Sequence, residues 1–442
     1  MAEIFPFRAW RYNAAKVNPA DVLTQPYDKI TPQMQERYYA RNPYNLIPVE
    51  KGKATPDDNA TNNVYTRARQ ALDQWVAGGV LVRESAPAIY AHKQDYTVPA
   101  TGEQRSRSGF IALGRVSDYS DGIVHRHEHT LSGPRADRLE LLRHTRAHTG
   151  QLFMLYSDPS RRIDALLEQA AQQPATVEVA DEYAVVHRLW PITDARNVQQ
   201  IVAAMADRKL VIADGHHRYE TAVAYRDECR ARKAHPSPSD PHEKVMMTFV
   251  NTESAGLTIL PTHRVLANVP SFSADALLRT LRAWFEVQPI VGEASDSAAK
   301  LDAARRAVTA GRNRRAIGLC AGRNAFWLLT LRTDAKLAQL IPGVSPAQLE
   351  LDVVLLHRVI LEKGLGISPE AVVKESYIRY EREMEAAVAA VQRGEAQACF
   401  LLNAVSVKQT VDMALAGEVL PQKSTDFYPK LLSGLTIYRL DD

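Results

Sequence analysis

Residues 210–222 read L-V-I-A-D-G-H-H-R-Y-E-T-A, and this stretch predicts the centre of the fold. The apolar run at 210–213 is typical of a buried parallel strand, and Asp214 and Gly215 end it abruptly. Helical spacing then continues to about Lys233. A strand, a one-glycine turn and a helix in this order place the N–H groups of the helix's first turn where they can hold an anion.

Three basic residues, His216, His217 and Arg218, begin the predicted helix. Positive side chains at a helix N-terminus oppose the helix dipole by about 0.3–1 kcal/mol each when exposed. An anion bound between these side chains explains why three basic residues are adjacent at this position. The alternative is an ordinary Asp-Gly turn whose basic residues cap the helix or lie in solvent. We interpret the stretch as a phosphate-binding turn in which Gly215 allows close backbone approach and His216 and Arg218 contact the phosphate.

Longer strings around this turn carry a family resemblance. D-G-H-H-R-Y at 214–219 resembles the signature turn of the ParB/sulfiredoxin-like fold, in the version carried by free serine kinases. A-D-G-H-H-R-Y-E-T-A, with H-E-H-T-L-S-G-P-R-A-D-R-L upstream, is similar to the DUF1015 family of bacterial and archaeal proteins. That resemblance extends to F-P-F-R-A-W-R-Y-N near the start, Q-P-Y-D-K-I at 25–30 and P-Q-K-S-T-D-F-Y-P-K-L at 421–431. It implies a mixed α/β fold, with a ParB/sulfiredoxin-like core flanked by N-terminal and C-terminal α/β segments.

The length of 442 residues is enough for two or three domains. We expect an N-terminal α/β segment at 1–120, the core with the phosphate-binding turn at 121–266 and a C-terminal α/β domain at 267–442. Within the first segment, the run L-I-P-V at 46–49 predicts a strand. The formal net charge of +3 is small for this size, so nothing suggests a nucleic-acid footprint over the whole surface.

The composition points to the cytoplasm and to no membrane partner. The cysteines, at 229, 320 and 399, are few, odd in number and far apart in the sequence, which excludes a disulfide framework and a C-x-x-C metal knuckle. Glu3 and Arg8 interrupt the apolar continuity that a signal peptide needs. No apolar run approaches the roughly 18 residues of a membrane helix.

The stretch 123–147 reads I-V-H-R-H-E-H-T-L-S-G-P-R-A-D-R-L-E-L-L-R-H-T-R-A and allows two interpretations. As a strand it places His125, His127 and His129 on one face, where imidazoles can bind Zn²⁺ or Fe²⁺. Three histidines on an edge strand are also commonly plain polar surface. In the other interpretation Glu128 precedes a helix at 136–147. The resemblance to serine kinases then implies that Glu128 lies across the nucleotide site from the 214–218 turn and is catalytic.

Other polar residues are further candidates for the site. Arg135 and Arg138, near the first turn of that helix, are candidates for phosphate contact, although arginines on a helix more often form a solvated face. The weaker candidates are Asp28 in the Q-P-Y-D string, His263 just after an apolar run, and Lys423 and Lys430, which frame hydroxyl residues close to the C-terminus.

The common nucleotide motifs are absent, because the sequence holds neither G-x-x-x-x-G-K-[ST] nor G-x-G-x-x-G after a strand. A kinase catalytic loop and a G-x-S-x-G elbow are also absent. The resemblance implies a nucleotide, ADP or ATP, together with Mg²⁺. Our leading hypothesis is a small-molecule kinase-like enzyme that transfers a phosphoryl group from the nucleotide to a small hydroxylated metabolite such as serine.

In this hypothesis the turn and Glu128 divide the chemistry between them. His216, His217 and Arg218 neutralise the charge of the transferring group. Asp214 holds Mg²⁺ or orients a histidine, and Glu128 takes the hydroxyl proton as a general base. The same pocket with water as acceptor makes a phosphatase that acts on a small phosphorylated metabolite such as phosphoserine. A ParB-like, nucleotide-gated DNA-binding protein is a third possibility, but it requires a helix-turn-helix with a basic surface, and the sequence shows neither.

Overall fold

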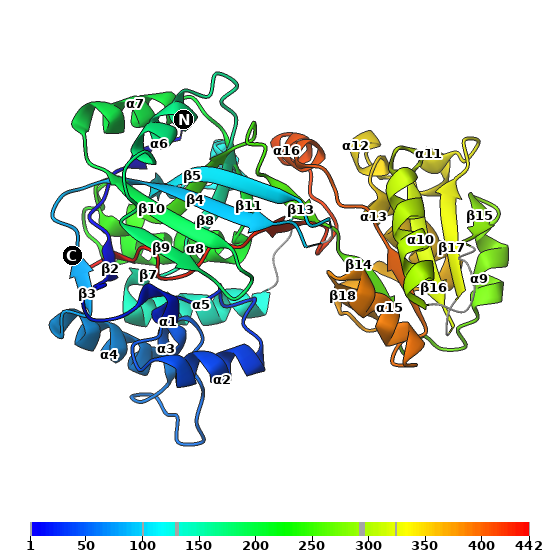
Figure 1. Cartoon of the computed structure of the whole chain (residues 1–442), viewed down its shortest axis with the longest axis horizontal. Helices are drawn as coiled ribbons and strands as arrows, with labels where there is room; N and C mark the ends of the chain where they lie inside the picture. Colours follow the sequence, from blue (N-terminus) through cyan, green and yellow to red (C-terminus); the bar gives the residue numbers. More distant parts are fainter. Residues whose placement is uncertain (1, 100, 129–131, 291–296, 323–324, 442) are drawn as a thin grey trace. The chain divides into compact units, whose positions relative to one another are not determined.

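The chain divides into two units in the computed structural model (Figure 1). The first contains Met1–Thr258 and Pro429–Asp442, and the second contains Ile259–Tyr428. The structure describes residues 2–99, 101–128, 132–290, 297–322 and 325–441. Each unit combines a sheet with helices, which confirms the mixed α/β class. The ParB/sulfiredoxin-like name for the core and the division at 120 and 266 stay predictions.

A mixed sheet of nine strands forms the centre of the first unit. In order across the sheet these are β6 (Val124–His125), β11 (Leu210–Asp214), β8 (Leu152–Tyr156), β12 (Lys244–Asn251), β5 (Gln104–Arg115), β4 (Ile89–Thr97), β10 (Val186–Ile192) and β9 (Val177–Ala180), and β1 (Ile4–Phe5) pairs with β5. Buried residues alternate along the strands, so that Met247 and Phe249 of β12 share one hydrophobic cluster while Met246 belongs to another.

The strand and the helix predicted around the Asp-Gly turn are both present. β11 is buried along its apolar residues, and α8 (His216–Arg232) follows after the single residue Gly215, whose φ is +97°. Glycine adopts this backbone conformation without strain. β11 is parallel to β6 on one side and antiparallel to β8 on the other. The strand is therefore buried as expected, but it is parallel to only one neighbour.

Helices cover both sides of this sheet (Figure 1). α6 (Arg162–Ala170) and α7 (Ala195–Met205) lie on one side, where they pack against the cluster that includes Met247 and Phe249. The other side holds α1 (Pro19–Val22), α2 (Pro32–Arg41), α3 (Ile47–Glu50), α4 (Val64–Ala77) and α5 (Ser132–Thr145). Because α5 packs against α8, the helix that starts at Gly215 is fixed by a neighbour as well as by its strand.

The C-terminal residues return to the first unit. β21 (Tyr438–Arg439) pairs with β7 (Ala147–His148). A separate two-stranded sheet pairs β2 (Trp10–Tyr12) with β3 (Leu81–Arg83). Leu435 of the tail is buried in the same cluster as residues of α4. The last segment of the chain is therefore part of the first unit's core.

The strand predicted at 46–49 is wrong, because these residues form the single helical turn α3. Asn45 Oδ1 accepts a hydrogen bond from the backbone N of Ile47 at 2.9 Å, and Pro48 lies in the first turn, where its missing N–H has no cost. An apolar run of four residues does not by itself distinguish a strand from a helical turn. The turn ends at Glu50, whose side chain is buried.

An antiparallel sheet of six strands forms the second unit. In order these are β15 (Phe285–Pro289), β17 (Ala325–Leu331), β16 (Ala316–Ala321), β19 (Ala398–Leu401), β14 (His263–Leu266) and β18 (Ile378–Glu381). The helices of this unit are α9 (Ala274–Leu281), α10 (Ser297–Ala310), α11 (Leu337–Leu340), α12 (Pro346–Leu349), α13 (Asp352–Val354), α14 (Pro369–Val373), α15 (Met384–Gln392) and α16 (Val407–Leu415), and a π-helical segment at Leu355–Gly364 continues α13. β13 (Thr258–Leu260) and β20 (Asp426–Tyr428) pair separately.

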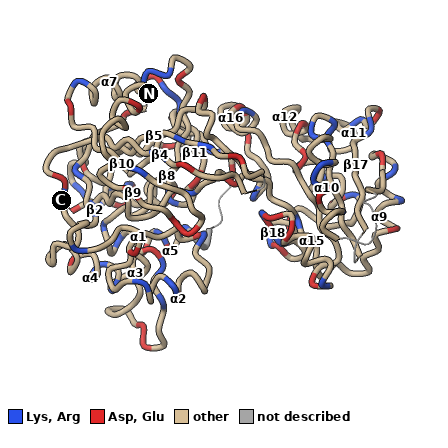
Figure 2. Tube along the Cα trace, viewed as in Figure 1, with Lys and Arg blue, Asp and Glu red and all other residues tan. Residues whose placement is uncertain are grey.

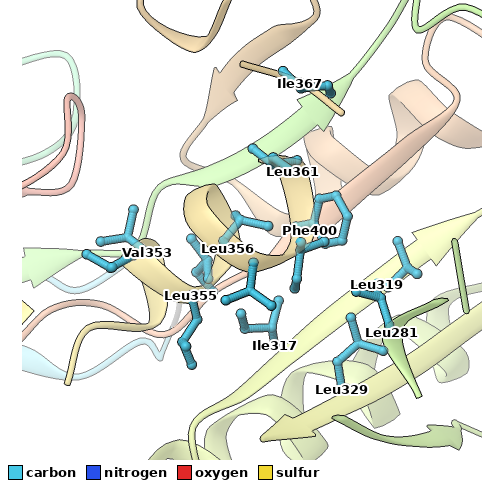
Figure 3. Packing of buried hydrophobic residues seen from close by; sticks show 14 of the residues in the cluster. Leu281, Ile317, Leu319, Leu329, Val353, Leu355, Leu356, Leu361, Ile367 and Phe400 are labelled. Carbon is cyan, nitrogen blue, oxygen red and sulfur yellow. The ribbon is translucent and has the colours of Figure 1, made fainter. Parts of the chain in front are cut away.

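Both faces of this second sheet are packed with apolar side chains. On one face, Ile317 and Leu319 share a hydrophobic cluster with Leu355 and Leu356 of the π-helical segment, and Figure 3 shows Ile317 beside these two leucines. On the other face, Cys320 of β16 lies directly opposite Cys399 of β19. Cysteines that are far apart in the sequence are thus cross-strand neighbours, and both are free.

Figure 2 shows basic and acidic residues interspersed along both units. Among the described residues, no helix combines the length and the apolar character needed to cross a membrane.

We expect the substitution Gly109→Ala to destabilise the central sheet. A Cβ at Gly109 in β5 would lie 2.5 Å from the carbonyl oxygen of Phe249 in β12, and backbone atoms of two paired strands cannot move apart cheaply. Overpacking of this kind typically costs about 1–3 kcal/mol of unfolding free energy. Urea unfolding followed by circular dichroism measures the change.

Gly102→Ala is the matched control. A Cβ there meets nothing within 4 Å, but the φ of +70° is unfavourable for alanine by about 1 kcal/mol. A Gly109→Ala protein that is as stable as the wild type contradicts the packing described for β5 and β12.

Candidate functional site

Two basic side chains bond the carboxylate of Asp214 at the end of β11. Lys430 Nζ donates to Oδ1 at 2.8 Å, and Arg218 Nη2 donates to Oδ2 at 2.9 Å. Arg218 comes from the first turn of α8, whereas Lys430 comes from the C-terminal tail. One negative and two positive charges leave the group with a net charge of +1, which attracts an anion.

Burial and ion pairing act in opposite directions on Asp214. Burial raises the pKa of this carboxyl, but Lys430 and Arg218 together outweigh that effect and hold the pKa well below its usual range. Asp214 is therefore ionised at neutral pH and keeps both basic groups in place.

The backbone that carries Lys430 is fixed by side chains of β4 and β5. Arg107, which is fully buried, donates to the carbonyl oxygen of Pro429 at 2.6 Å and to Gln94 Oε1 at 3.0 Å. Gln94 Nε2 in turn donates to the carbonyl oxygen of Lys430 at 2.9 Å. These bonds fix the carbonyl groups of Pro429 and Lys430. The backbone from which the lysine side chain reaches Asp214 is therefore held in place.

Gly215 leaves room for Arg218 to fold back over the turn. A Cβ at Gly215 would lie 3.1 Å from Arg218 Nη2 and 3.1 Å from Leu152 Cδ2 in β8. Arg218 Nη1 also donates to the carbonyl oxygen of Gln151. Glycine is thus required here by its positive φ and by the space that the guanidinium takes. Because Gly215 has no side chain to cap α8, the first N–H groups of the helix are not used by a capping side chain. Such N–H groups can bind an anion.

A pair of buried histidines connects the 123–128 segment to the turn. His127 Nδ1 lies 2.7 Å from the carbonyl oxygen of Ile212 in β11. The backbone N of His127 donates to His216 Nε2 at 3.4 Å, and the two rings meet edge to face with their centroids 4.6 Å apart. The segment that ends in Glu128 is therefore held against the strand and the helix that carry the turn.

Neither of these histidines is positively charged at neutral pH. Burial lowers the pKa of His127 to about 4 and holds the pKa of His216 well below its usual value. The expectation that His216 adds positive charge is therefore wrong. The positive charge described at the turn comes from Arg218 and Lys430.

A cavity of about 60 Å³ lies beside Arg218. Its polar lining comes from Tyr27, Glu50, Arg138, His148, Thr149, Arg218 and Thr221, and Gly150 also faces it. A second cavity of about 200 Å³ shares Tyr27 and Arg138 with the first. The first cavity thus brings together α3, α5, α8 and the turn that contains Tyr27.

Arg138 lines both cavities and contacts three neighbouring residues. It donates to Asp137 Oδ2 at 2.6 Å and to the backbone carbonyl oxygen of Glu50 at 2.8 Å. Its guanidinium carbon lies 4.4 Å from the centre of the Tyr27 ring. Burial, followed by the charge of Asp28, raises the pKa of Tyr27 to about 12, so this phenol stays neutral. Arg138 is therefore not a solvated residue on a helix face.

The other residues predicted for the site lie around the same part of the first unit. Glu128 is half-buried and directly follows His127, and His217 is half-buried in the first turn of α8. Arg135 is exposed near the start of α5, and Asp28 is exposed in the turn after Tyr27. Their predicted roles stay predictions.

Two of the weaker candidates belong to the second unit. His263 is buried in β14, where its Nδ1 accepts a hydrogen bond from the backbone N of Leu402 at 3.2 Å. Burial lowers the pKa of His263 to about 3, so it is a neutral acceptor inside the sheet. Lys423 is exposed and has a φ of +55°.

The part of the chain that the structure describes contains no group of three His, Cys, Asp or Glu side chains placed to hold a metal ion. Of the three histidines considered together, His127 bonds the Ile212 carbonyl, His125 Nε2 lies 3.1 Å from the carbonyl oxygen of Gly122, and His129 lies outside the described residues. Each oxygen of Asp214 bonds one basic side chain, and its role as a Mg²⁺ ligand stays a prediction.

Sequence reasoning missed Glu50, Thr149 and Gln151. Thr149 and Gln151 lie in a stretch without any recognisable motif, and Glu50 follows a run that reads as a strand. The Q-P-Y-D string at 25–28 was the available signal, because Tyr27 from that string lines the cavity with Glu50.

A model of the family described as "Protein of unknown function (DUF1015)" matches residues 4–354. No curated protein matches the sequence. Among solved structures, a conserved hypothetical protein from Pyrococcus furiosus is 12% identical, with a TM-score of 0.33 over 72% of this chain and 93% of that chain. A free serine kinase in complex with AMP is 12% identical, with a TM-score of 0.34 over 72% of this chain and 89% of that chain. SbnI with C-terminal truncation from Staphylococcus aureus is 10% identical, with a TM-score of 0.33 over 74% of this chain and 87% of that chain. The family match covers most of the chain, whereas these structural likenesses are distant.

We expect Lys430→Met to lower the unfolding free energy of the first unit by about 1–3 kcal/mol at pH 7, because one oxygen of Asp214 loses its donor while Arg218 remains. The lowered pKa of Asp214 stabilises the fold above its unfolded-state pKa of about 4, and this contribution is lost as the pH falls further. The variant and the wild type should therefore converge at low pH. Urea unfolding at several pH values measures both effects.

Lys408→Met is the control for this change, since Lys408 makes an exposed ion pair with Asp412 on α16. Surface pairs of this kind contribute about 0–1 kcal/mol. Equal losses of stability in the two variants contradict the role of Lys430 described above.

We expect His127→Gln to flatten the pH dependence of stability between pH 6.5 and pH 4. An unfolded histidine binds a proton below about pH 6.5, whereas buried His127 does so only below about pH 4. The wild type therefore loses stability as the pH falls through this window, by up to about 1.4 kcal/mol per pH unit from this residue. Unfolding at pH 8 separates the loss of packing from the titration. An unchanged slope below pH 6.5 is the contrary result.

Proposed function

Because this chain belongs to the DUF1015 family of proteins of unknown function, we propose its function from the chemistry of the site: nucleotide-dependent phosphoryl transfer to a small hydroxylated metabolite. The 214–218 turn binds the transferring group, and Glu128 accepts the proton of the attacking hydroxyl. The resemblance of the turn to that of free serine kinases supports ADP or ATP as the donor and serine or a close relative as the acceptor.

The observation that carries this proposal is the pair of basic groups, Arg218 and Lys430, fixed on Asp214 beside the start of α8. Phosphoryl transfer spreads negative charge over the oxygens of the transferring group, and stabilising that charge is the main task of the protein. A net charge of +1 next to a helix N-terminus supports the binding of such a group.

Arg218 and Lys430 suit this task because they are oriented before any ligand binds. Arg218 is bonded to Asp214 and to the Gln151 carbonyl, and the Lys430 peptide is clamped by Gln94 and Arg107. Side chains that are already ordered lose little conformational entropy on binding. In this proposal Asp214 orients both basic groups.

The reaction exchanges one P–O bond for another. The bond between the transferred phosphorus and the nucleotide oxygen breaks, a bond to the acceptor oxygen forms, and the acceptor proton passes to the Glu128 carboxylate. General-base catalysis of this kind typically contributes 10²–10⁴-fold to the rate. The contact of His127 with His216 supports a position for Glu128 close to the turn.

The remaining predicted residues have supporting roles. His216 is neutral, so with His217 it would contribute hydrogen-bond donors in place of charge. Arg135, exposed near the start of α5, and Arg138, on the cavity wall, stay candidates for contact with the nucleotide phosphates. Mg²⁺ would neutralise charge on those phosphates, with Asp214 as its predicted ligand, and no step of this proposal depends on it.

We expect Glu128→Gln to lower the rate of phosphoryl transfer by about 10²-fold or more. The affinity for the nucleotide should stay within a few-fold of the wild-type value. Phosphorus NMR of the purified protein with ADP or ATP and serine, with and without Mg²⁺, measures transfer, and calorimetry measures nucleotide binding. Glu168→Gln is the matched control, because Glu168 is an exposed carboxylate on α6.

These spectra, with one more recorded on phosphoserine alone, separate the possible outcomes. Phosphoserine as the product supports the kinase, and inorganic phosphate released from phosphoserine without nucleotide supports a phosphatase that uses the same turn. A Glu128→Gln protein that loses nucleotide binding together with transfer shows that Glu128 is not the base. Absence of nucleotide binding in the wild type overturns the proposal.

A further inference from the structure

Glu50 is a buried carboxylate at the wall of the cavity beside Arg218. It ends α3, and only 3% of the residue is exposed. Its Oε1 accepts a hydrogen bond from the backbone N of Tyr27 at 3.2 Å, and its Oε2 accepts one from Thr149 Oγ1 at 2.9 Å. Among the described residues, no Lys, Arg or His side chain lies within ion-pairing distance of this carboxylate.

This arrangement leaves the carboxylate without a matching positive charge. Buried ionised groups are normally paired with an opposite charge, because removing them from water is costly. A carboxylate offers about four acceptor positions, and Tyr27 and Thr149 use two of them. About two acceptor positions of Glu50 therefore remain for N–H donors of a ligand in the cavity, which Arg138 and Arg218 also line.

Gly150 keeps the space in front of Glu50 open. A Cβ at this position would lie 3.0 Å from Ser433 Oγ, 3.2 Å from Arg218 Nη1 and 3.8 Å from Glu50 Oε1. Gly150 does not have a positive φ, so its backbone conformation does not demand glycine. The missing side chain instead leaves a space that is bordered by the Ser433 hydroxyl, the Glu50 carboxylate and the Arg218 guanidinium.

Ser433 adds an independent observation at the same place. It is fully buried, and its Oγ has no hydrogen-bond partner among the described residues. Buried hydroxyl groups are normally satisfied by a partner, so an orphaned one points to a ligand or a water. A group that donates to Glu50 would lie within reach of Ser433 as well.

We propose that this cavity is an ammonium-binding subsite, in which Glu50 and Ser433 accept hydrogen bonds from a primary amine of the acceptor and Arg218 faces its anionic part. The volume of about 60 Å³ accommodates an ammonium group with its carbon. The inference rests on the proposed function for its choice of acceptor, and it narrows that acceptor to a small molecule bearing both an amine and a hydroxyl. Amine binding itself needs no phosphoryl transfer.

Calorimetry of the full chain with L-serine and with glycerate tests this inference. The two molecules differ only in an amine against a hydroxyl at one carbon. We expect the wild type to bind serine at least about 10-fold more tightly than glycerate, and Glu50→Gln to lose that preference while nucleotide affinity stays unchanged. Glu36→Gln, which removes an exposed carboxylate of α2, is the matched control and should keep the preference.

Glu50→Gln preserves the local hydrogen bonds, because the amide oxygen accepts from Tyr27 and the Thr149 hydroxyl can accept from the amide N–H. Gly150→Ala provides a second variant, which keeps the charge of Glu50 and fills the space in front of it. It should also lose serine binding. Circular dichroism melts confirm that both variants are folded.

The outcomes distinguish this inference from the proposed function. Serine binding that depends on Glu50, without phosphoryl transfer to any acceptor, supports the subsite and overturns the proposed function. Phosphoryl transfer to serine and glycerate with equal efficiency, unaffected by Glu50→Gln, supports the function and overturns the subsite. Ethanolamine carries the amine and the hydroxyl of serine without its carboxylate. A wild type that binds neither serine nor ethanolamine also overturns the subsite.

Discussion

The carboxylate of Asp214 holds together two basic groups that are far apart in the sequence. Arg218 is four residues away on the helix that follows the strand, whereas Lys430 is brought back by the C-terminal tail. Because each oxygen of the carboxylate is used once, the arrangement depends on all three side chains together. The net positive charge at the turn depends on this contact, and Arg218, which takes part in it, also lines the adjoining cavity.

Buried polar groups around the turn support that contact through bonds to the backbone. Arg107 and Gln94 hold the carbonyl groups of Pro429 and Lys430, and His127 bonds the carbonyl of Ile212. Each of these interactions satisfies a main-chain acceptor inside the protein, where an unpaired group is costly. The hydroxyl of Ser433 has no hydrogen-bond partner among the described residues, and it borders the same space in front of Gly150 as the carboxylate of Glu50.

The second unit uses similar residue types for packing. Arg264 is fully buried in β14 and donates to the carbonyl oxygens of Thr262, Gln422 and Lys423, and His263 accepts from the Leu402 backbone. The same histidine and arginine chemistry that suggests a binding site in the sequence here fixes a loop and a strand. Residue type alone does not separate these two uses, because both need a polar group held in one orientation.

The sequence by itself determined the strand, the glycine turn and the helix at 210–232, because apolar spacing and the conformational freedom of glycine act over a few neighbouring residues. It also marked Asp214, Gly215 and Arg218, which lie within five positions of one another, and it marked Lys430 without indicating its partner. Only the tertiary structure decided that Lys430 bonds Asp214, that His216 is neutral, and that Glu50 and Gly150 border the same cavity. Those facts depend on burial and on contacts between segments far apart in the chain, and such contacts leave no periodic pattern in the sequence.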